Sequence, residues 1–264
     1  KVSIEPFTRV KLDPIFEDNL ILQIFRTKNR DFLLGNAKNE LYYGPLYTSN
    51  YKLKTHFRVN HILECPMGTL ICSEKGIYTL KNDEIRETSI PNQQDKPIKF
   101  AIWDGEKLWF APAGDGLYSY HPETGACQKI KSPGNADYYY CGQRSPDGKF
   151  IYFGTNVGIK KLNLATKRVT HIQQFNEIGA YAGNATTDKY GNLWFTLDRG
   201  LAGIDRNHRL IIIKDPTILP SYLFYTLSSD QLGNLIIGTN LGIHIVRVNR
   251  EGKVIYNKNY NEKN

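Results

Sequence analysis

Six histidines are the residues best suited to proton transfer near neutral pH, and they are dispersed along the chain. They are His56, His61, His121, His171, His208 and His244. Only His61 lies near a predicted inner strand together with a carboxylate, Glu64, and His121 and His208 fall in predicted turns. The chain has no G-x-S-x-G, H-E-x-x-H, Walker or dinucleotide-binding glycine motif. We therefore predict that no residue of this chain is catalytic.

Metal and thiol chemistry receive little support from residue spacing. Asp104-Gly105-Glu106 and Asp147-Gly148 lack the alternating ligands of a calcium loop, so turn chemistry explains them. The four cysteines, Cys65, Cys72, Cys127 and Cys141, have no C-x-x-C spacing and no partnered histidine. We predict that all four are reduced and structural, with a disulfide left open for an oxidising compartment. No metal and no cofactor are expected.

Aromatic residues and arginines near the predicted inner strands are better candidates for function. Tyrosine and tryptophan rings can stack on sugar rings, and arginine binds carboxylate or sulfate groups through two parallel hydrogen bonds. The alternative is that each ring fills space between neighbouring sheets. The predicted ligand site lies at the end of a central channel where inner strands begin, and it comprises Arg58, Trp103, Tyr138, Arg144, Tyr181 and Tyr222.

A repeat of about 40 residues sets the positions of these side chains. A short apolar strand followed by a small or turn-forming residue recurs with its last apolar residue at positions 34, 72, 110, 153, 195 and 237. Such a period, with several strands per unit, is typical of a β-propeller. We predict an all-β fold of about six four-stranded antiparallel blades in a single domain, 1–264. The predicted repeats are 15–55, 56–95, 96–134, 135–175, 176–217 and 218–260.

The clearest copy of the repeat runs from Asp188 to Thr196, and Asp230 to Thr239 matches it closely. The aspartate opens a turn by accepting hydrogen bonds from nearby backbone, and Gly191 takes a positive φ. Trp194, in the strand that follows, is predicted to pack between blades. In Tyr138-Tyr139-Tyr140, strand alternation turns the middle ring away from the other two.

These copies resemble the two-component regulator propeller repeats, whose pattern is D-x-x-G-N-L-W-I-G-T followed by a G-L strand. The resemblance covers essentially the whole chain and implies the extracytoplasmic sensor region of a hybrid histidine kinase of the Bacteroidetes type. It further implies a periplasmic segment of a membrane-anchored protein, cut from a longer sensor. Neighbouring propeller or sensor domains are then expected partners, and the full-length receptor is expected to be a dimer.

A second family is similar over one repeat only. Gly191 to Thr196, with Gly203-Ile204-Asp205 downstream, resembles the repeats of streptogramin (virginiamycin B) lyases. Such an enzyme needs a histidine base and a magnesium site, and no histidine recurs beside carboxylates at an inner-strand position. The lyase is therefore the alternative to a sensor, and a protein-interaction platform is a third possibility.

Composition limits the remaining classes of function. With 41% hydrophobic and 23% charged residues, the 264-residue chain can bury a core and is not a disordered segment. The formal net charge of +8 comes from scattered lysines and arginines, and no nucleic-acid-binding motif is present. No apolar stretch is long enough to span a membrane, so we expect neither nucleic acid nor membrane contact. The main hypothesis is a non-catalytic propeller that recognises an oligosaccharide or another small-molecule ligand.

Overall fold

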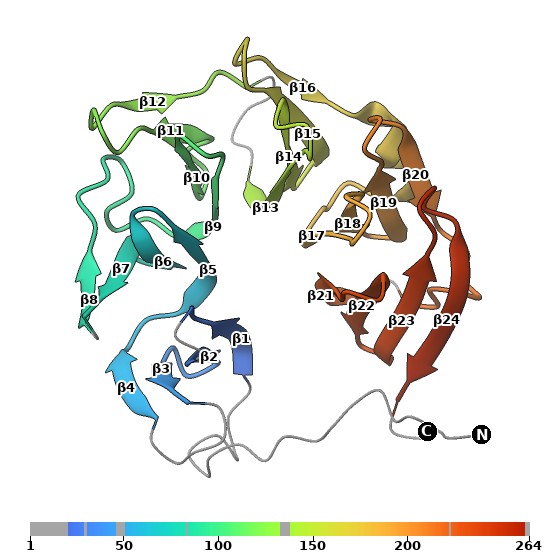
Figure 1. Ribbon diagram of the computed structural model, residues 1–264, viewed down its shortest axis with the longest axis horizontal. Helices are drawn as coiled ribbons and strands as arrows, with labels where there is room; N and C mark the ends of the chain where they lie inside the picture. Colours follow the sequence, from blue (N-terminus) through green and yellow to red (C-terminus); the bar gives the residue numbers. More distant parts are fainter. Residues whose placement is uncertain are drawn as a thin grey trace. The chain divides into compact units, whose positions relative to one another are not determined.

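The computed structural model describes residues 21–28, 31–45, 51–82, 84–132, 138–221 and 223–261. These residues form 24 strands in six four-stranded antiparallel sheets, and the described part contains almost no helix. Each sheet runs in chain order from its first strand to its fourth (Figure 1). The fold is a six-bladed β-propeller, as the repeat predicts.

The chain divides into two compact units, Lys1–Ile98 and Lys99–Asn264. The first unit contains two sheets. Their strands are β1 (Ile21–Arg26), β2 (Phe32–Asn36), β3 (Leu41–Gly44), β4 (Lys52–Thr55), β5 (Val59–Cys65), β6 (Gly68–Ser73), β7 (Ile77–Lys81) and β8 (Glu84–Glu87). Leu33 and Leu41 of one sheet pack with Ile62 and Ile71 of the other in a buried cluster.

The second unit contains the other four sheets. Their strands are β9 (Ile98–Trp103), β10 (Leu108–Pro112), β11 (Tyr118–Tyr120), β12 (Cys127–Lys129), β13 (Tyr139–Arg144), β14 (Phe150–Thr155), β15 (Gly158–Asn163), β16 (Val169–His171), β17 (Ala185–Thr187), β18 (Leu193–Leu197), β19 (Gly200–Ile204), β20 (Leu210–Ile213), β21 (Phe224–Ser229), β22 (Asn234–Thr239), β23 (Gly242–Val248) and β24 (Val254–Tyr260). A short 3-10 helix, η2 (Gln173–Ile178), follows β16. Three buried clusters each join two consecutive sheets of this unit.

The turn between β17 and β18 explains the aspartate of the repeat. Asp188 is only 4% exposed. Its Oδ1 accepts hydrogen bonds from the amides of Tyr190 and Asn192, at 2.8 and 2.9 Å. Its Oδ2 accepts from Asn192 Nδ2 and Trp194 Nε1, both at 2.9 Å. Gly191 completes the turn with a φ of 83°, a conformation that glycine adopts without a steric penalty.

The same carboxylate arrangement recurs in two other sheets of the second unit. Asp104 accepts from the amides of Glu106 and Lys107 through Oδ1, and from Trp109 Nε1 at 2.6 Å through Oδ2. Asp230 accepts from the amide and the side chain of Asn234. The interpretation of these segments as turns is therefore confirmed.

Trp194 is fully buried between two sheets. It belongs to a cluster with Leu201 of its own sheet and with Leu235 and Ile237 of the next sheet. The residue directly opposite on β19 is Gly203, where a Cβ would lie 2.7 Å from the indole ring. The predicted role of Trp194 in packing between blades is confirmed.

We expect Trp194→Ala to lower the free energy of unfolding by about 3–5 kcal/mol, because it removes a fully buried indole and leaves a cavity between two sheets. Trp194→Phe should cost less, since it keeps most of the ring and loses the hydrogen bond to Asp188. Urea unfolding followed by circular dichroism measures both variants. Equal stability of wild type and Trp194→Ala would contradict the packing role.

Candidate functional site

Two of the predicted site residues are exposed at the same end of neighbouring sheets in the second unit. Tyr138 directly precedes β13, and Tyr181 lies in the segment that leads into β17. Their exposed fractions are 42% and 46%. The inner strands β13 and β17 lie side by side, joined by the hydrogen bond from Thr187 Oγ1 to Gln143 Oε1 at 3.0 Å. We call the ends where β13 and β17 begin the start face.

The three consecutive tyrosines alternate as predicted. Tyr139 is 2% exposed and packs edge-on against Phe153, with 5.5 Å between ring centroids. Tyr140 is half-buried and contacts Tyr181, with centroids 4.8 Å apart and an interplanar angle of 51°. The amide of Tyr138 donates to Asn156 Oδ1 at 2.9 Å, and a Cβ at Gly114 would lie 3.4 Å from the Tyr138 hydroxyl. The ring of Tyr138 therefore reaches the β10–β11 turn of the preceding sheet.

The segment Gly179–Asn184 carries Tyr181 from one sheet to the next, and its backbone bonds to both. The amide of Ala182 donates to the carbonyl of Thr155 at 2.9 Å, at the end of β14. The amides of Ala180 and Tyr181 donate to Asp198 Oδ2 at 2.8 and 3.1 Å, in the β18–β19 turn. The backbone of Tyr181 is thus fixed while its ring stays half exposed.

The surroundings of Tyr140 and Tyr181 make their phenol groups hard to ionise. Burial raises the pKa of Tyr181, and the neighbouring Tyr140, Cys141 and Asp198 raise it further. Burial also raises the pKa of Tyr140, with a smaller contribution from Tyr138. Both side chains are therefore neutral hydrogen-bonding aromatic groups near neutral pH, suited to stacking rather than to acid–base catalysis.

Two of the predicted site residues lie at the opposite ends of their strands. Arg144 is the last residue of β13, and it lies five residue steps, roughly 16 Å, from Tyr139 at the start of the strand. Its guanidinium lies against the β13–β14 turn, because a Cβ at Gly148 would be 2.7 Å from Arg144 Nη2. Trp103 is likewise the last residue of β9. The prediction that these two residues share an end with Tyr138 and Tyr181 is wrong, because the last residue of an inner strand lies at the opposite end of the sheet from its first residue.

The other two predicted residues are Arg58 and Tyr222. Arg58 belongs to the first unit, where it is exposed directly before β5 and its amide donates to Glu74 Oε1 at 3.4 Å. Tyr222 lies outside the described residues. The sequence analysis also missed Asp198. Its place in the β18–β19 turn, two strands after Tyr181, was the feature of the sequence that could have indicated it.

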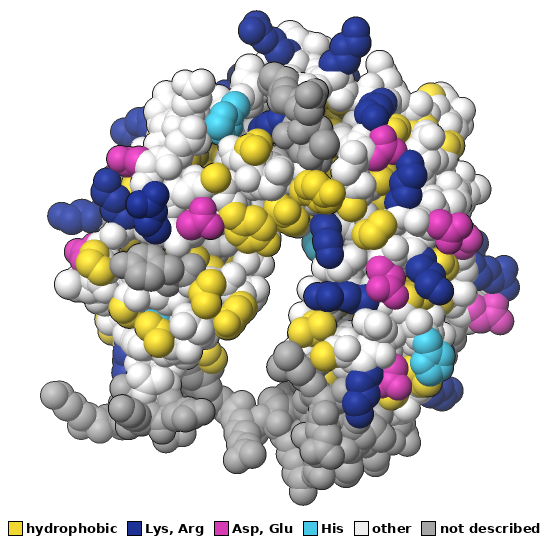
Figure 2. All heavy atoms as spheres, turned by 180° about the vertical axis from the view of Figure 1, so that it is seen from behind, with side chains coloured by type: hydrophobic (Ala, Val, Ile, Leu, Met, Phe, Trp, Pro, Cys, Tyr) yellow, Lys and Arg dark blue, Asp and Glu magenta, His cyan; other side chains and the backbone are white. Residues whose placement is uncertain are grey.

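On the face seen in Figure 2, hydrophobic side chains gather in the upper middle of the view, over inner strands of the second unit. Among the described residues, no group of three or more histidine, cysteine, aspartate or glutamate side chains is arranged to hold a metal ion. Within the same residues, no helix has the length and apolar character needed to cross a membrane. All four cysteines are free thiols, and burial raises the pKa of the Cys72 thiol.

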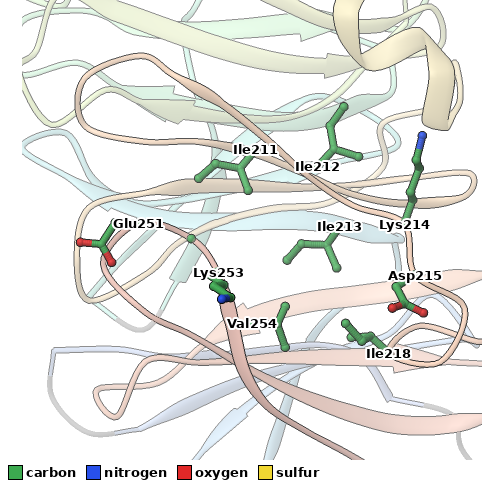
Figure 3. A pocket seen from close by; sticks show the side chains of 10 residues that line it. Ile211, Ile212, Ile213, Lys214, Asp215, Ile218, Glu251, Lys253 and Val254 are labelled. Carbon is green, nitrogen blue, oxygen red and sulfur yellow. The ribbon is translucent and has the colours of Figure 1, made fainter.

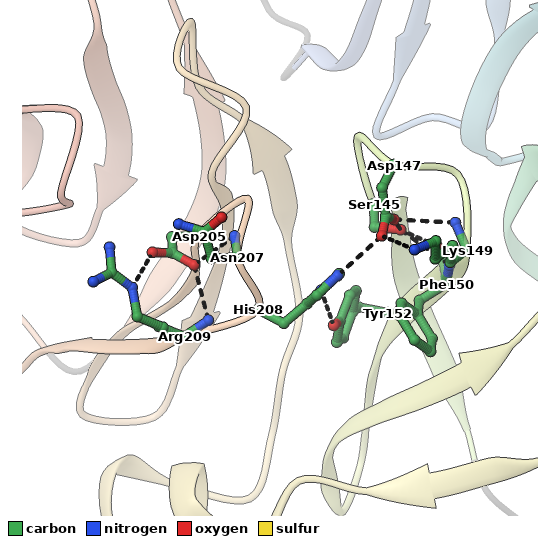
Figure 4. A network of polar contacts seen from close by, with 9 residues as sticks. All are labelled: Ser145, Asp147, Lys149, Phe150, Tyr152, Asp205, Asn207, His208 and Arg209. Carbon is green, nitrogen blue, oxygen red and sulfur yellow. Dashed lines mark hydrogen bonds and ion pairs between the residues drawn. The ribbon is translucent and has the colours of Figure 1, made fainter.

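At the opposite end of the second unit, His208 joins two sheets (Figure 4). It lies in the β19–β20 turn with a φ of 62°, and its Nε2 is 3.1 Å from Asp147 Oδ2. Its Nδ1 is 3.0 Å from the hydroxyl of Tyr152. Asp147 Oδ1 also accepts from Ser145 Oγ at 2.6 Å and from the amide of Lys149 at 3.1 Å.

This Asp147–His208–Tyr152 network has the residue types of a proton relay, but its geometry is structural. Tyr152 is 1% exposed, and burial together with the Asp147 charge raises its pKa. A phenol in that position neither reaches a substrate nor loses its proton at neutral pH. Both ring nitrogens of His208 are already within hydrogen-bonding distance of side chains of the preceding sheet. The network therefore holds two blades together.

An apolar groove lies elsewhere in the second unit, between β20 and the beginning of β24 (Figure 3). Its volume is about 530 Å³. Ile211, Ile213, Ile218 and Val254 line it, with Lys214, Asp215, Glu251 and Lys253 around them. None of the predicted site residues lines this groove.

No protein-family model matches the chain, and no curated protein matches its sequence. Solved structures share its fold. Virginiamycin B lyase from Staphylococcus aureus is 13% identical, with a TM-score of 0.71 over 92% of this chain and 85% of that one. The chain shares this fold with sensor domains too.

The extracellular domain of a hybrid two-component system from B. thetaiotaomicron is 15% identical, with a TM-score of 0.69 over 92% of this chain and 36% of that one. The corresponding domain of a one-component system from the same organism is 16% identical, with a TM-score of 0.66 over 87% and 33%. This chain therefore spans about a third of those sensor structures. The resemblance to two-component sensor propellers holds for the fold, which does not decide whether this segment is catalytic.

The Asp147 network generates a pH prediction. Burial raises the pKa of Asp147, but hydrogen bonds from Ser145, the Lys149 amide and His208 outweigh it and lower the pKa from 3.8 to about 2. Because the folded pKa is below the unfolded one, ionised Asp147 stabilises the fold above pH 3.8, and this contribution is lost as the pH falls toward 2. With the carboxylate 29% exposed, solvent screening reduces it to about 1 kcal/mol.

Asp147→Asn should therefore be less stable than wild type by about 1 kcal/mol near neutral pH, and the difference should shrink as the pH falls from 3.8 to about 2. Urea unfolding at a series of pH values measures it. Glu251→Gln is the matched control, because Glu251 is exposed and has no ion pair in the described part of the chain. A difference independent of pH would contradict the assignment.

Proposed function

We propose that this chain is a non-catalytic, ligand-sensing propeller of a two-component signal-transduction receptor, and that it binds a glycan-derived ligand on the start face. The observation that carries the proposal is the exposure of Tyr138 and Tyr181 at the same end of neighbouring sheets, with Tyr181 against Tyr140. Aromatic faces of this kind stack on the apolar faces of sugar rings. The periplasmic location of the segment, in a membrane-anchored protein, is part of the same proposal.

Polar groups next to these rings support a sugar ligand. Asn184 lies three residues after Tyr181 and donates through Nδ2 to Thr196 Oγ1 at 3.3 Å. Asn156, in the β14–β15 turn, accepts from the amide of Tyr138. Amides and hydroxyls beside exposed rings supply the hydrogen-bonding groups that orient a polyhydroxylated ligand.

The likeness to sensor structures supports the signalling part of the proposal. The extracellular domains that share this fold are about three times as long as the matched region, which leaves room for further propeller or sensor domains as partners. A dimeric receptor fits the same scheme. Signalling requires that the ligand bind one packing arrangement of these domains better than another.

A lyase is the second candidate, favoured by one observation. The structural match to this chain covers 85% of the lyase, so the likeness extends over most of that enzyme. A structure of an inactive form of the lyase contains quinupristin. Incubating this chain with quinupristin therefore tests the lyase candidate directly. A change of the antibiotic detected by mass spectrometry would favour the enzyme over the sensor.

We expect the chain to bind at least one member of a panel of neutral and acidic oligosaccharides in isothermal titration calorimetry. Replacing Tyr138 and Tyr181 together by alanine should weaken that binding roughly tenfold or more, because two exposed stacking surfaces are lost. Tyr256→Ala is the control, since this tyrosine of β24 is also 42% exposed and lies on an outer strand. Unchanged affinity in the double variant would exclude the start face.

A further inference from the structure

The corner between Tyr140 and Tyr181 has a geometry suited to a positive charge. Their ring centroids are 4.8 Å apart and the planes are inclined by 51°. A cation interacts favourably with an aromatic face when it lies within about 6 Å of the centroid. A single ammonium group can meet that distance for both rings at once. Tyr181 is 46% exposed, so the corner is open to a ligand from solvent.

The carboxylate of Asp198 lies beside this corner and forms no ion pair with another described residue. Asp198 Oδ2 accepts the amides of Ala180 and Tyr181, whereas Oδ1 receives no hydrogen bond from the described residues. Among the described residues, no lysine, arginine or histidine forms an ion pair with Asp198. An ionised carboxylate has about four acceptor positions, so Asp198 retains capacity for a further donor.

The surroundings of the two phenols agree with this charge balance. Apart from burial, the groups that raise the pKa of Tyr181 are Tyr140, Cys141 and Asp198. For Tyr140, the corresponding group is Tyr138. None of these groups is a lysine, an arginine or a histidine. The guanidinium that was expected to serve the site, Arg144, lies at the other end of β13.

We propose that the Tyr140–Tyr181–Asp198 corner binds a protonated amino group, and that the ligand is an amino sugar rather than an acidic one. This inference rests on the proposed function, because it names the class of glycan that the start face would take. The rings attract the ammonium group through their faces, and the Asp198 carboxylate accepts one of its N–H groups. The sugar ring next to the amine then stacks against the exposed part of Tyr181.

The test compares ligands that carry a positive charge with related ligands that carry none. Chitosan oligomers carry free amines, and chitin oligomers of the same length carry neutral N-acetyl groups. Tetramethylammonium and the uncharged tert-butanol extend the comparison to probes without a sugar. Ligand-observed NMR measures binding of each to the wild-type chain. We expect chitosan oligomers to bind about tenfold more tightly than chitin oligomers, and tetramethylammonium to bind while tert-butanol does not.

Asp198→Asn is the decisive variant. An asparagine oxygen can still accept the two amides that position Tyr181, so the change removes the charge and keeps the segment in place. It should abolish the preference for chitosan over chitin. Asp215→Asn is the matched control, because Asp215 also accepts a backbone amide, from Thr217 at 2.8 Å, in the groove away from the tyrosines. It should leave the preference unchanged.

The outcomes separate this inference from the proposed function. Equal binding of chitosan and chitin oligomers, lost in the Tyr138 and Tyr181 double variant, would overturn the amine site and support a sugar-binding start face. Binding of tetramethylammonium but of no oligosaccharide would support the amine site and overturn the glycan ligand. Binding of none of the probes, or a preference retained in Asp198→Asn, would overturn the amine site.

Discussion

The aspartate at the turn between the first and second strands is the constraint on which three of the four blades of the second unit depend. Burying a carboxylate is costly unless hydrogen bonds compensate, and Asp188 receives four N–H donors while only 4% exposed. One of those donors is the indole of Trp194, which fills the space between two sheets. The turn and the packing between blades are therefore parts of a single interaction. Asp104 and Trp109 repeat it two sheets earlier.

This constraint separates structure from function along each strand. At the turn end, polar side chains are committed to holding the fold, as His208 is to Asp147 and Tyr152. At the start face, the chain between sheets is outside the repeated motif. Tyr181 lies in that part of the chain, and Asp198 lies at the same end, in the β18–β19 turn. The exposed ring of Tyr181 takes no part in the hydrogen bonds of the turn end.

The sequence predicted the architecture well because the period and the turn residues encode it locally. Six sheets follow from the spacing, and the burial of Tyr139 between two less buried tyrosines follows from strand alternation. The site was harder to predict. Placing Arg144 required knowing that β13 is six residues long, so that its last residue lies at the far end. The contact of Tyr140 with Tyr181 depends on the path of the segment between two sheets, which no short motif specifies.

The segment Gly179–Asn184 couples two neighbouring sheets mechanically. It is fastened at Thr155 in one sheet and at Asp198 in the next, and Tyr181 projects from the span between these two fastenings. Gly154 allows the span to pass close to β14, because any side chain there would collide with the carbonyl of Ala182. A displacement of the Tyr181 ring would therefore act on both sheets at once, through the hydrogen bonds that hold its backbone to each of them.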